Sequence, residues 1–257
     1  MKRILKIVGL VLVLLVLALA AVVAATFLGR QSITDGAQIG TIRIVKDGIV
    51  SVAVLPVGPR EVALVDAGND AAGAAILAEL GKRQLGPDAV TAIFLTHGHP
   101  DHTGAAHLFP KAQLMALEAE VGLVEGREGA HGPLTRLFPV SPTGLKVTRP
   151  LHDGETVTLE QTAVRVFAVP GHTAGSAAYL VNGALFLGDA ADTNTAGEIS
   201  GSPWIFSDSQ AQDRASLVRL ADRLAAEHAD VKALVFAHSG VRTEGLTPLA
   251  AFAQKNR

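Results

Sequence analysis

The chain has 257 residues, of which 49% are hydrophobic and 18% are charged, and this content is enough to bury a substantial core. The formal net charge is only -2 and Lys and Arg form no cluster in the body of the chain, so we expect no nucleic-acid partner. The chain contains no cysteine, which excludes disulfides and thiolate ligands and leaves His, Asp and Glu to build any transition-metal site.

An amino-terminal segment is predicted to enter a membrane. Lys2, Arg3 and Lys6 precede a stretch from Ile7 to Leu28 that carries no charged side chain. This stretch has roughly the 20 apolar residues that a helix needs to cross a bilayer core. Because the basic residues come before it, the sequence predicts a cytoplasmic amino terminus and an exported domain.

A cleaved signal sequence is the alternative interpretation of this segment. Ala18-Leu19-Ala20 and Val23-Ala24-Ala25 resemble small-residue cleavage sites, although the apolar run is longer than the usual core of a signal sequence. We therefore predict a membrane anchor or signal segment over residues 1–30 and one folded domain over residues 38–257. That domain is expected on the extracytoplasmic side of the cell membrane, held by a single spanning helix, or secreted or periplasmic after cleavage.

Short strands begin at about residue 40. The run "TIRIVKDGIVSVAVLPVG" predicts a hairpin around Asp47-Gly48, and "EVALVDAG" predicts a third strand that ends near Asp66. A helix is predicted over residues 70–86, because "DAAGAAILAELGKRQLG" has an apolar stripe and stops at a glycine before a proline. The uncharged run "VTAIFL" at 90–95 predicts a strand that is covered on both faces.

The second half of the chain follows a similar rhythm. Strands are predicted over 144–159 and 162–171, a hairpin over 176–190 around Asn182-Gly183, a helix over 213–229 and a buried strand over 231–240. Two segments rich in Gly, Pro and Ser, 122–144 and 190–208, are predicted to be irregular loops that cover a site. His131 and Trp204 lie in these loops, as candidates for substrate contact or for structural roles.

The segment "THGHPDHTG" at 96–104 follows the predicted strand at 90–95 and crowds four metal-ligating side chains into six positions. In an extended segment His97 and His99 point to the same side of the chain and can share a metal ion. Three further candidates each follow an apolar strand with a glycine close by, which suits a preorganised metal site. The candidate ligands are His97, His99, Asp101, His102, His172, Asp189 and His238.

The order and spacing of these residues resemble the metallo-β-lactamase superfamily of metallohydrolases, from about residue 40 to residue 240. The resemblance implies an α/β fold, an αββα four-layer sandwich behind the amino-terminal transmembrane helix, with the metal site at one edge of the two packed sheets. It implies two ligand sets joined by a bridging carboxylate: His97, His99 and His172; Asp101, His102 and His238; and Asp189 between them. It further implies that Asp66 hydrogen-bonds a ligand histidine and fixes its tautomer.

Such a site would be a binuclear hydrolase centre. Two zinc ions would lower the pKa of a bridging water, hold the hydroxide and polarise the bond that it attacks, while Asp101 would orient the hydroxide and pass on a proton. Iron and manganese accept the same ligands. The expected reaction is hydrolysis of an ester, lactone, thioester or amide in a small molecule.

Features of the sequence also favour one branch of the superfamily and leave alternatives open. True β-lactamases of this motif type generally lack an aspartate at the position of Asp189, so the resemblance favours a glyoxalase-II-like or lactonase-like branch. A mononuclear iron enzyme of the persulfide-dioxygenase type, with His97, His172 and Asp189 as ligands, is one alternative. A non-catalytic, membrane-tethered binding module is the other. Tyr179, inside a predicted strand, is expected to serve packing. No oligomeric state is predicted.

Overall fold

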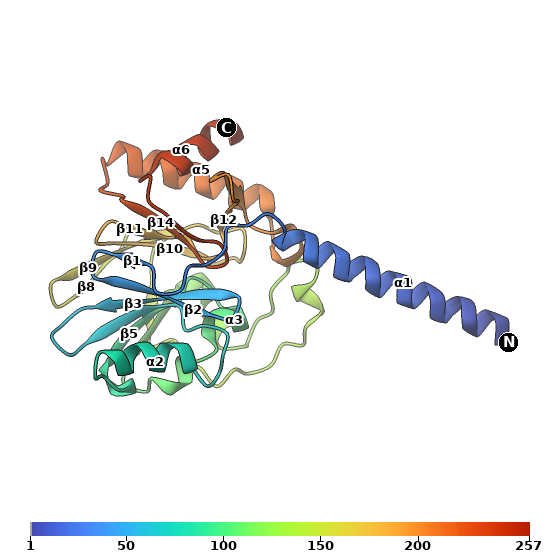
Figure 1. Ribbon diagram of the computed structural model, residues 1–257, viewed down its shortest axis with the longest axis horizontal. Coiled ribbons are helices and arrows are strands. Elements are labelled where there is room, and N and C mark those ends of the chain that lie inside the picture. The colour runs from blue at the N-terminus through green and yellow to red at the C-terminus, as the bar shows by residue number, and fades with distance from the viewer. Residues whose placement is uncertain (1) are drawn as a thin grey trace.

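The computed structural model describes residues 2–257. Figure 1 shows two β-sheets packed face to face, with α2 below them, α5 and α6 above them and α1 projecting away from the domain. This arrangement confirms the predicted αββα four-layer sandwich. The α-helices within these residues are α1 (Lys2–Phe27), α2 (Ala74–Lys82), α3 (Pro100–Thr103), α4 (Val121–Val124), α5 (Gln210–Ala226) and α6 (Thr247–Asn256).

The first sheet has seven strands in the order of the chain, antiparallel from β1 to β4 and parallel from β4 to β7. Its strands are β1 (Gln38–Ile39), β2 (Ile42–Asp47), β3 (Val50–Pro56), β4 (Val62–Val65), β5 (Val90–Phe94), β6 (Gln113–Leu117) and β7 (Arg149–Leu151). The second sheet has the order β15-β14-β11-β10-β9-β8, in which β11 and β14 are parallel. Its strands are β8 (Thr156–Leu159), β9 (Thr162–Ala168), β10 (Ala177–Val181), β11 (Ala184–Phe186), β14 (Ala233–Phe236) and β15 (Gly240–Arg242).

Three apolar clusters hold the layers together. The largest lies between the sheets and joins residues such as Ile44 and Phe94 to Tyr179. A second packs Ile76 of α2 and its neighbours against the first sheet, and a third packs Leu217 of α5 and its neighbours against the second sheet. Strands that are buried on both faces explain the uninterrupted apolar runs in the sequence.

Both predicted hairpins are present. Asp47 and Val50 are the last pair of β2 and β3, and Val181 pairs with Ala184 across the turn at Asn182-Gly183. The prediction for residues 190–208 was wrong in part, because this segment contains a small antiparallel sheet formed by β12 (Ala191–Thr193) and β13 (Ile199–Gly201). Strands this short carry too few alternating residues to be recognised from the sequence.

The long helix α1 carries no charge after Lys6 and its side chains are almost all exposed, so it meets the length and composition of a membrane span or a signal sequence. It continues directly into the domain. The Nη2 atom of Arg30 lies 2.8 Å from the buried carboxylate of Asp192, and the backbone N–H of Gln31 donates to the carbonyl of Thr193 at 2.9 Å. The chain immediately after α1 is therefore fixed against β12.

Candidate metal centre

The predicted ligands all follow the carboxyl ends of strands at one edge of the sandwich. The loop after β5 carries the 97–102 group, the loop after β9 carries His172, and Asp189 and His238 follow the parallel strands β11 and β14. Strands that run in the same direction bring their following loops to the same edge, which is where sites of layered α/β proteins gather. All seven candidate ligands belong to three overlapping groups whose ligand atoms lie within 4.8 Å of one another.

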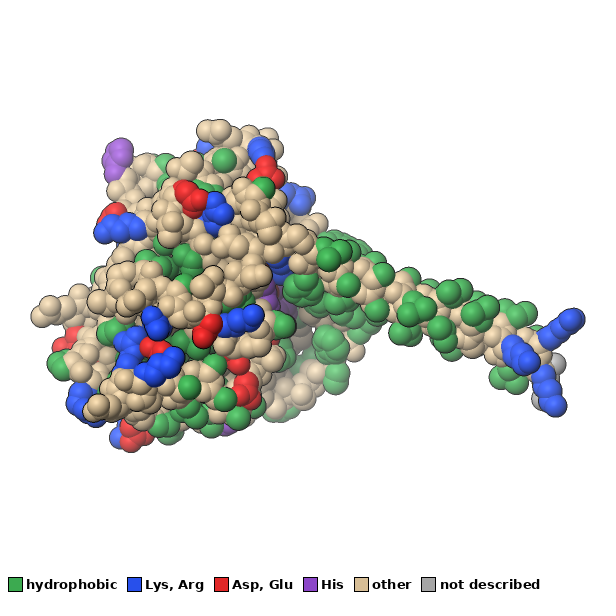
Figure 2. Space-filling view, in the orientation of Figure 1, with side chains coloured by type: hydrophobic (Ala, Val, Ile, Leu, Met, Phe, Trp, Pro, Cys, Tyr) green, Lys and Arg blue, Asp and Glu red, His purple; other side chains and the backbone are tan. Residues whose placement is uncertain are grey.

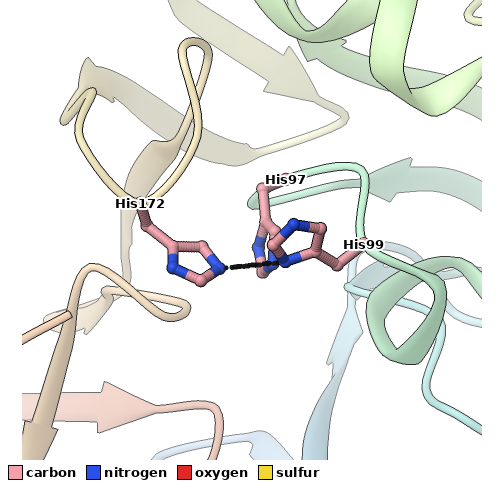
Figure 3. A group of neighbouring side chains, drawn as sticks. All are labelled: His97, His99 and His172. Atoms are coloured by element: carbon pink, nitrogen blue, oxygen red, sulfur yellow. Dashed lines mark hydrogen bonds between the residues drawn. The ribbon is translucent and has the colours of Figure 1, made fainter. Parts of the chain in front are cut away.

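Three histidines from two loops form the first group (Figure 3). The Nδ1 atom of His99 lies 3.0 Å from Nε2 of both His97 and His172, and the last two nitrogens are 3.2 Å apart. All three side chains are buried. Three imidazole nitrogens that converge in this way form one face of a coordination site.

The second group combines Asp101, His102 and His238, and Asp189 lies between it and the first. One oxygen of Asp189 is 3.1 Å from Nε2 of His238 and 3.6 Å from Nε2 of His172. Its other oxygen is 3.3 Å from Nε2 of His102. The Oδ2 atom of Asp101 lies 3.4 Å from the same nitrogen of His238. The structure thus brings together all seven candidate ligands.

Two of the histidine rings are oriented by hydrogen-bond acceptors on the side away from the cluster, which contact Nδ1. Nδ1 of His102 lies 2.8 Å from the carboxylate of Asp66, which is the hydrogen bond expected for that residue, and Nδ1 of His238 lies 2.8 Å from the carbonyl of Ile49. A carboxylate and a carbonyl only accept, so in both rings Nδ1 carries the proton. In each ring Nε2 is consequently the nitrogen that faces the cluster.

Ser207 does the same for His172, and the sequence analysis missed it. Its hydroxyl donates to the carbonyl of Pro203 at 2.6 Å and therefore accepts from Nδ1 of His172 at 2.9 Å. In the neutral ring Nε2 of His172 therefore carries no proton, and its lone pair points toward the cluster. Ser207 lies in the segment 190–208, where a serine in a loop carries no signal of such a role.

The donor set fits divalent cations. Nε2 of His102 and Oδ1 of Asp189 are buried polar atoms without a hydrogen-bond partner among residues 2–257, and buried atoms of this kind require an explanation. Burial lowers the pKa of His97 and His99 and brings that of His172 to about 3, so these rings are neutral and offer lone pairs. Nitrogen and carboxylate donors without sulfur suit zinc, iron and manganese.

The other half of the cluster is charged. Burial alone would lower the pKa of His102, but the carboxylates of Asp66, Asp189 and Asp101 outweigh it and raise that pKa well above its usual value. His238 follows the same pattern, because Asp189 and Asp101 raise its pKa to about 10 against the effect of burial. Cations would replace these protons, since ligand histidines must be neutral to bind.

Comparison with known proteins identifies the family of this site. The model of the metallo-beta-lactamase superfamily matches residues 46–238. The chain belongs to this superfamily. The match runs through every candidate ligand from His97 to His238, as the resemblance of the motif had predicted.

Among curated relatives, hydroxyacylglutathione hydrolase of Cupriavidus taiwanensis is 35% identical over 164 residues, which cover 62% of this chain and 53% of the relative. Hydroxyacylglutathione hydrolase of Shewanella sp. is 36% identical over 107 residues, covering 39% of this chain and 34% of the relative. Metallo-beta-lactamase domain-containing protein 1 of Mus musculus is 35% identical over 112 residues, or 42% of this chain and 43% of the relative. The chain thus spans from a third to about half of the length of these relatives.

Solved structures share the fold over most of the chain. A metallo-beta-lactamase family protein of Thermus thermophilus is 26% identical, covers 85% of this chain and 80% of its own, and has a TM-score of 0.62. A subclass B3 metallo-beta-lactamase from a soil metagenome is 20% identical, with a TM-score of 0.65 over 88% of this chain and 94% of its own. At 20% identity, the similarity to the metagenome protein shows a shared fold.

A buried carboxylate that the sequence analysis also missed ties two ligand loops of this superfamily member together. Oε1 of Glu120 accepts from the backbone N–H of Gly98 at 2.8 Å, between His97 and His99. Its Oε2 accepts from the N–H of Gly175 at 2.8 Å and from the hydroxyl of Thr173 at 3.0 Å. Burial raises the pKa of Glu120 to about 7, although these donors favour the ionised form. Glu120 therefore sets the distance between the two histidine loops.

Three other residues singled out in the sequence have ordinary placements. Tyr179 is fully buried and its hydroxyl donates to the carbonyl of Leu95 at 2.6 Å, which confirms a packing role. His131 is exposed and does not line the pocket beside the metal centre. Trp204 is 58% exposed, so it is not a buried plug of its loop.

A pocket of about 370 Å³ opens beside the cluster. His99, Asp101, Asp189 and His238 form one part of its wall. Most of the remaining wall is apolar and comes from distant parts of the chain: Phe27, Ile49, Pro100, Leu123, Ala130, Phe138, Pro139, Val140, Pro203 and Phe206. Candidate metal ligands at the side of a mainly apolar pocket are the arrangement expected of a small-molecule site.

Proposed function

We propose that this protein is a zinc-dependent hydrolase that cleaves an ester, lactone, thioester or amide bond in a small molecule. The observation that carries the proposal is the convergence of five histidines and two aspartates on one side of the apolar pocket. Membership of a superfamily of metallohydrolases supports it.

The structure supports two ligand sets for this activity. In the proposed assignment, His97, His99 and His172 hold one ion, and Asp101, His102 and His238 hold the other. Asp189 lies between the two sets, because its Oδ2 faces Nε2 of both His172 and His238, while its Oδ1 faces Nε2 of His102. When bound, two zinc ions would acidify a water molecule and polarise the carbonyl oxygen of the substrate.

Asp101 is the residue that we propose to move the proton. Burial would raise its pKa, but His102 and His238 lower it to about 2, so the carboxylate is ionised and can accept a proton. Its side chain is 24% exposed and lines the pocket. In the proposed reaction the oxygen of water bonds to the acyl carbon, the bond to the leaving oxygen, sulfur or nitrogen breaks, and Asp101 carries the proton from water to that leaving atom.

The names of the curated relatives support acyl transfer to water as the proposed reaction. Several of them are named hydroxyacylglutathione hydrolase, and the matched region includes about half of the Cupriavidus taiwanensis protein. We propose that the present chain shares the hydrolytic chemistry of that group. The proposal does not extend to the glutathione leaving group in the names of these relatives, because the chain matches only part of each relative.

The first test of this proposal measures metal and turnover on one sample. The full chain, purified in mild detergent, is expected to contain two zinc ions per chain by elemental analysis and to hydrolyse at least one member of an ester, lactone and thioester panel. Removal of metal with a chelator should abolish turnover, and added zinc should restore it. One iron per chain with oxygen consumption, or no turnover of any panel member by the metal-loaded chain, would contradict the proposal.

We also propose that the domain lies outside the cytoplasm on the α1 anchor. The support is the order of charge: Lys2, Arg3 and Lys6 stand at the far end of α1, and positive residues stay on the cytoplasmic side. Protease added to cells with a permeabilised outer layer is expected to degrade the domain while a cytosolic marker survives. Protection of the domain equal to that of the marker would refute this placement.

A further inference from the structure

The exposed apolar residues of the domain gather around the pocket. Outside α1 and Leu28, the large apolar side chains that are exposed within residues 2–257 are Ile49, Leu137, Phe138, Val140 and Trp204. Ile49, Phe138 and Val140 line the pocket, and they are 58%, 62% and 56% exposed. Leu137 and Trp204 are next in sequence to the lining residues Phe138 and Pro203. Concentrated exposed apolar surface of this kind marks a binding site.

The membrane helix ends at the same place. Phe27, the last residue of α1, lines the pocket, and its ring lies 6.2 Å from that of Phe206 and 6.1 Å from that of His238. The guanidinium of Arg30 lies over the Phe27 ring at 4.5 Å and is paired with Asp192, so this end of the helix is held against the domain. Figure 2 shows apolar side chains and histidine atoms together in the hollow at the base of α1.

The length of α1 brings the pocket to the surface of the bilayer. The apolar stretch from Ile7 to Phe27 is about 30 Å long at 1.5 Å per residue, which matches a hydrocarbon core of about 30 Å. If Lys2, Arg3 and Lys6 lie in one interface, Phe27 therefore lies at the other. The pocket wall that contains Phe27 then opens where lipid chains meet water.

We infer that the pocket binds the hydrocarbon chain of an amphiphilic ester or amide, which enters from the bilayer that holds α1. The chain would lie against Phe138, Val140 and Phe206, and the bond to be cleaved would lie beside His238 and Asp101. This inference rests on the proposed hydrolase function and names its substrate class. A patch that only touched lipid would not need a cavity that leads to the metal centre.

The test compares acyl chain lengths in a lipid bilayer. The zinc-loaded full chain in phosphatidylcholine vesicles is offered the acetyl, hexanoyl and decanoyl esters of umbelliferone. We expect kcat/KM to rise at least about 10-fold from acetyl to decanoyl, because each added methylene is buried. Val140→Asp and Phe138→Ser should each lower the ratio of kcat/KM for the decanoyl ester to that for the acetyl ester several-fold, since each places a polar group against the acyl chain.

Leu137→Asp is the matched control, because Leu137 is 70% exposed in the same loop and does not line the pocket. It should keep the wild-type ratio. A ratio that is flat in the wild type, or equal in all four proteins, would overturn the inference while leaving hydrolysis itself established. No hydrolysis of any ester by the zinc-loaded wild type would instead overturn the proposed function.

A second arm identifies the source of the substrate. The oleoyl ester of umbelliferone, which exchanges slowly between vesicles, is placed either in the vesicles that contain the protein or in separate protein-free vesicles. We expect turnover at least about 10-fold faster when ester and protein share a bilayer. Equal rates would show that the amphiphile arrives through water, and entry from the bilayer would then be wrong.

Discussion

Asp189→Asn is expected to lower kcat by about 100-fold or more on the best substrate and to weaken binding of at least one metal ion. The carboxylate faces histidines of both ligand sets, with 3.6 Å to Nε2 of His172 in one set and 3.1 Å to Nε2 of His238 in the other. Asparagine removes the negative charge and turns one acceptor oxygen into an NH₂ donor. That donor cannot bind a cation, so one of the two sets loses a ligand.

The measurements are zinc stoichiometry by elemental analysis, zinc affinity by competition with a chelator and steady-state turnover. Asp208→Asn is the control, because the backbone N–H of Asp208 donates to the carbonyl of His172 at 3.0 Å. Its side chain accepts from the N–H of His131 at 2.7 Å and belongs to none of the metal-ligating groups. This substitution should change kcat by less than about 3-fold, since an asparagine oxygen can still accept that bond. Wild-type stoichiometry and turnover in Asp189→Asn would make Asp189 a bystander and would remove the support for a bridged centre.

The candidate ligands, which the structure places close together, could be picked out from the sequence because of their residue types and their positions after strands. His97, His99, Asp101 and His102 lie within six positions, and His172, Asp189 and His238 each follow a recognisable apolar strand. The strands themselves were predicted from periodicity, whereas the four-layer arrangement was implied by the resemblance of the motif. Periodicity and residue type carry this information directly.

The supporting residues could not be predicted, because their roles depend on contacts between distant segments. Glu120 and Glu118 stand two positions apart after an apolar run, and nothing in the sequence separates the buried carboxylate from the exposed one. Ser207 reaches His172 across 35 positions. The position of Phe27 in the pocket wall depends on the path of the chain after α1, which the pairing of Arg30 with Asp192 fixes.

The largest stability effect is expected from Glu120→Gln. The carboxylate satisfies buried donors with both oxygens: Gly98 on one side, and Gly175 with Thr173 on the other. A glutamine amide has one oxygen, so its NH₂ must face either the N–H of Gly98 or that of Gly175. Thr173 can turn its hydroxyl to accept, but a backbone N–H cannot. One buried donor therefore loses its acceptor, which costs about 1–3 kcal/mol.

For a domain of this size that loss corresponds to a fall in Tm of roughly 2–12 °C. Calorimetry of the full chain should be done below the raised pKa of Glu120, where the wild-type side chain is neutral too and relief of a buried charge does not offset the loss. Zinc affinity should also fall, because the loops that carry His97 and His172 are no longer held at one distance. Glu118→Gln is the matched control, with a side chain that is 73% exposed two positions away, and it should leave both quantities unchanged. If Glu120→Gln kept the wild-type Tm, the hydrogen bonds of Glu120 would contribute nothing to stability. If it lowered Tm but kept zinc affinity, Glu120 would support the fold without positioning the ligand loops.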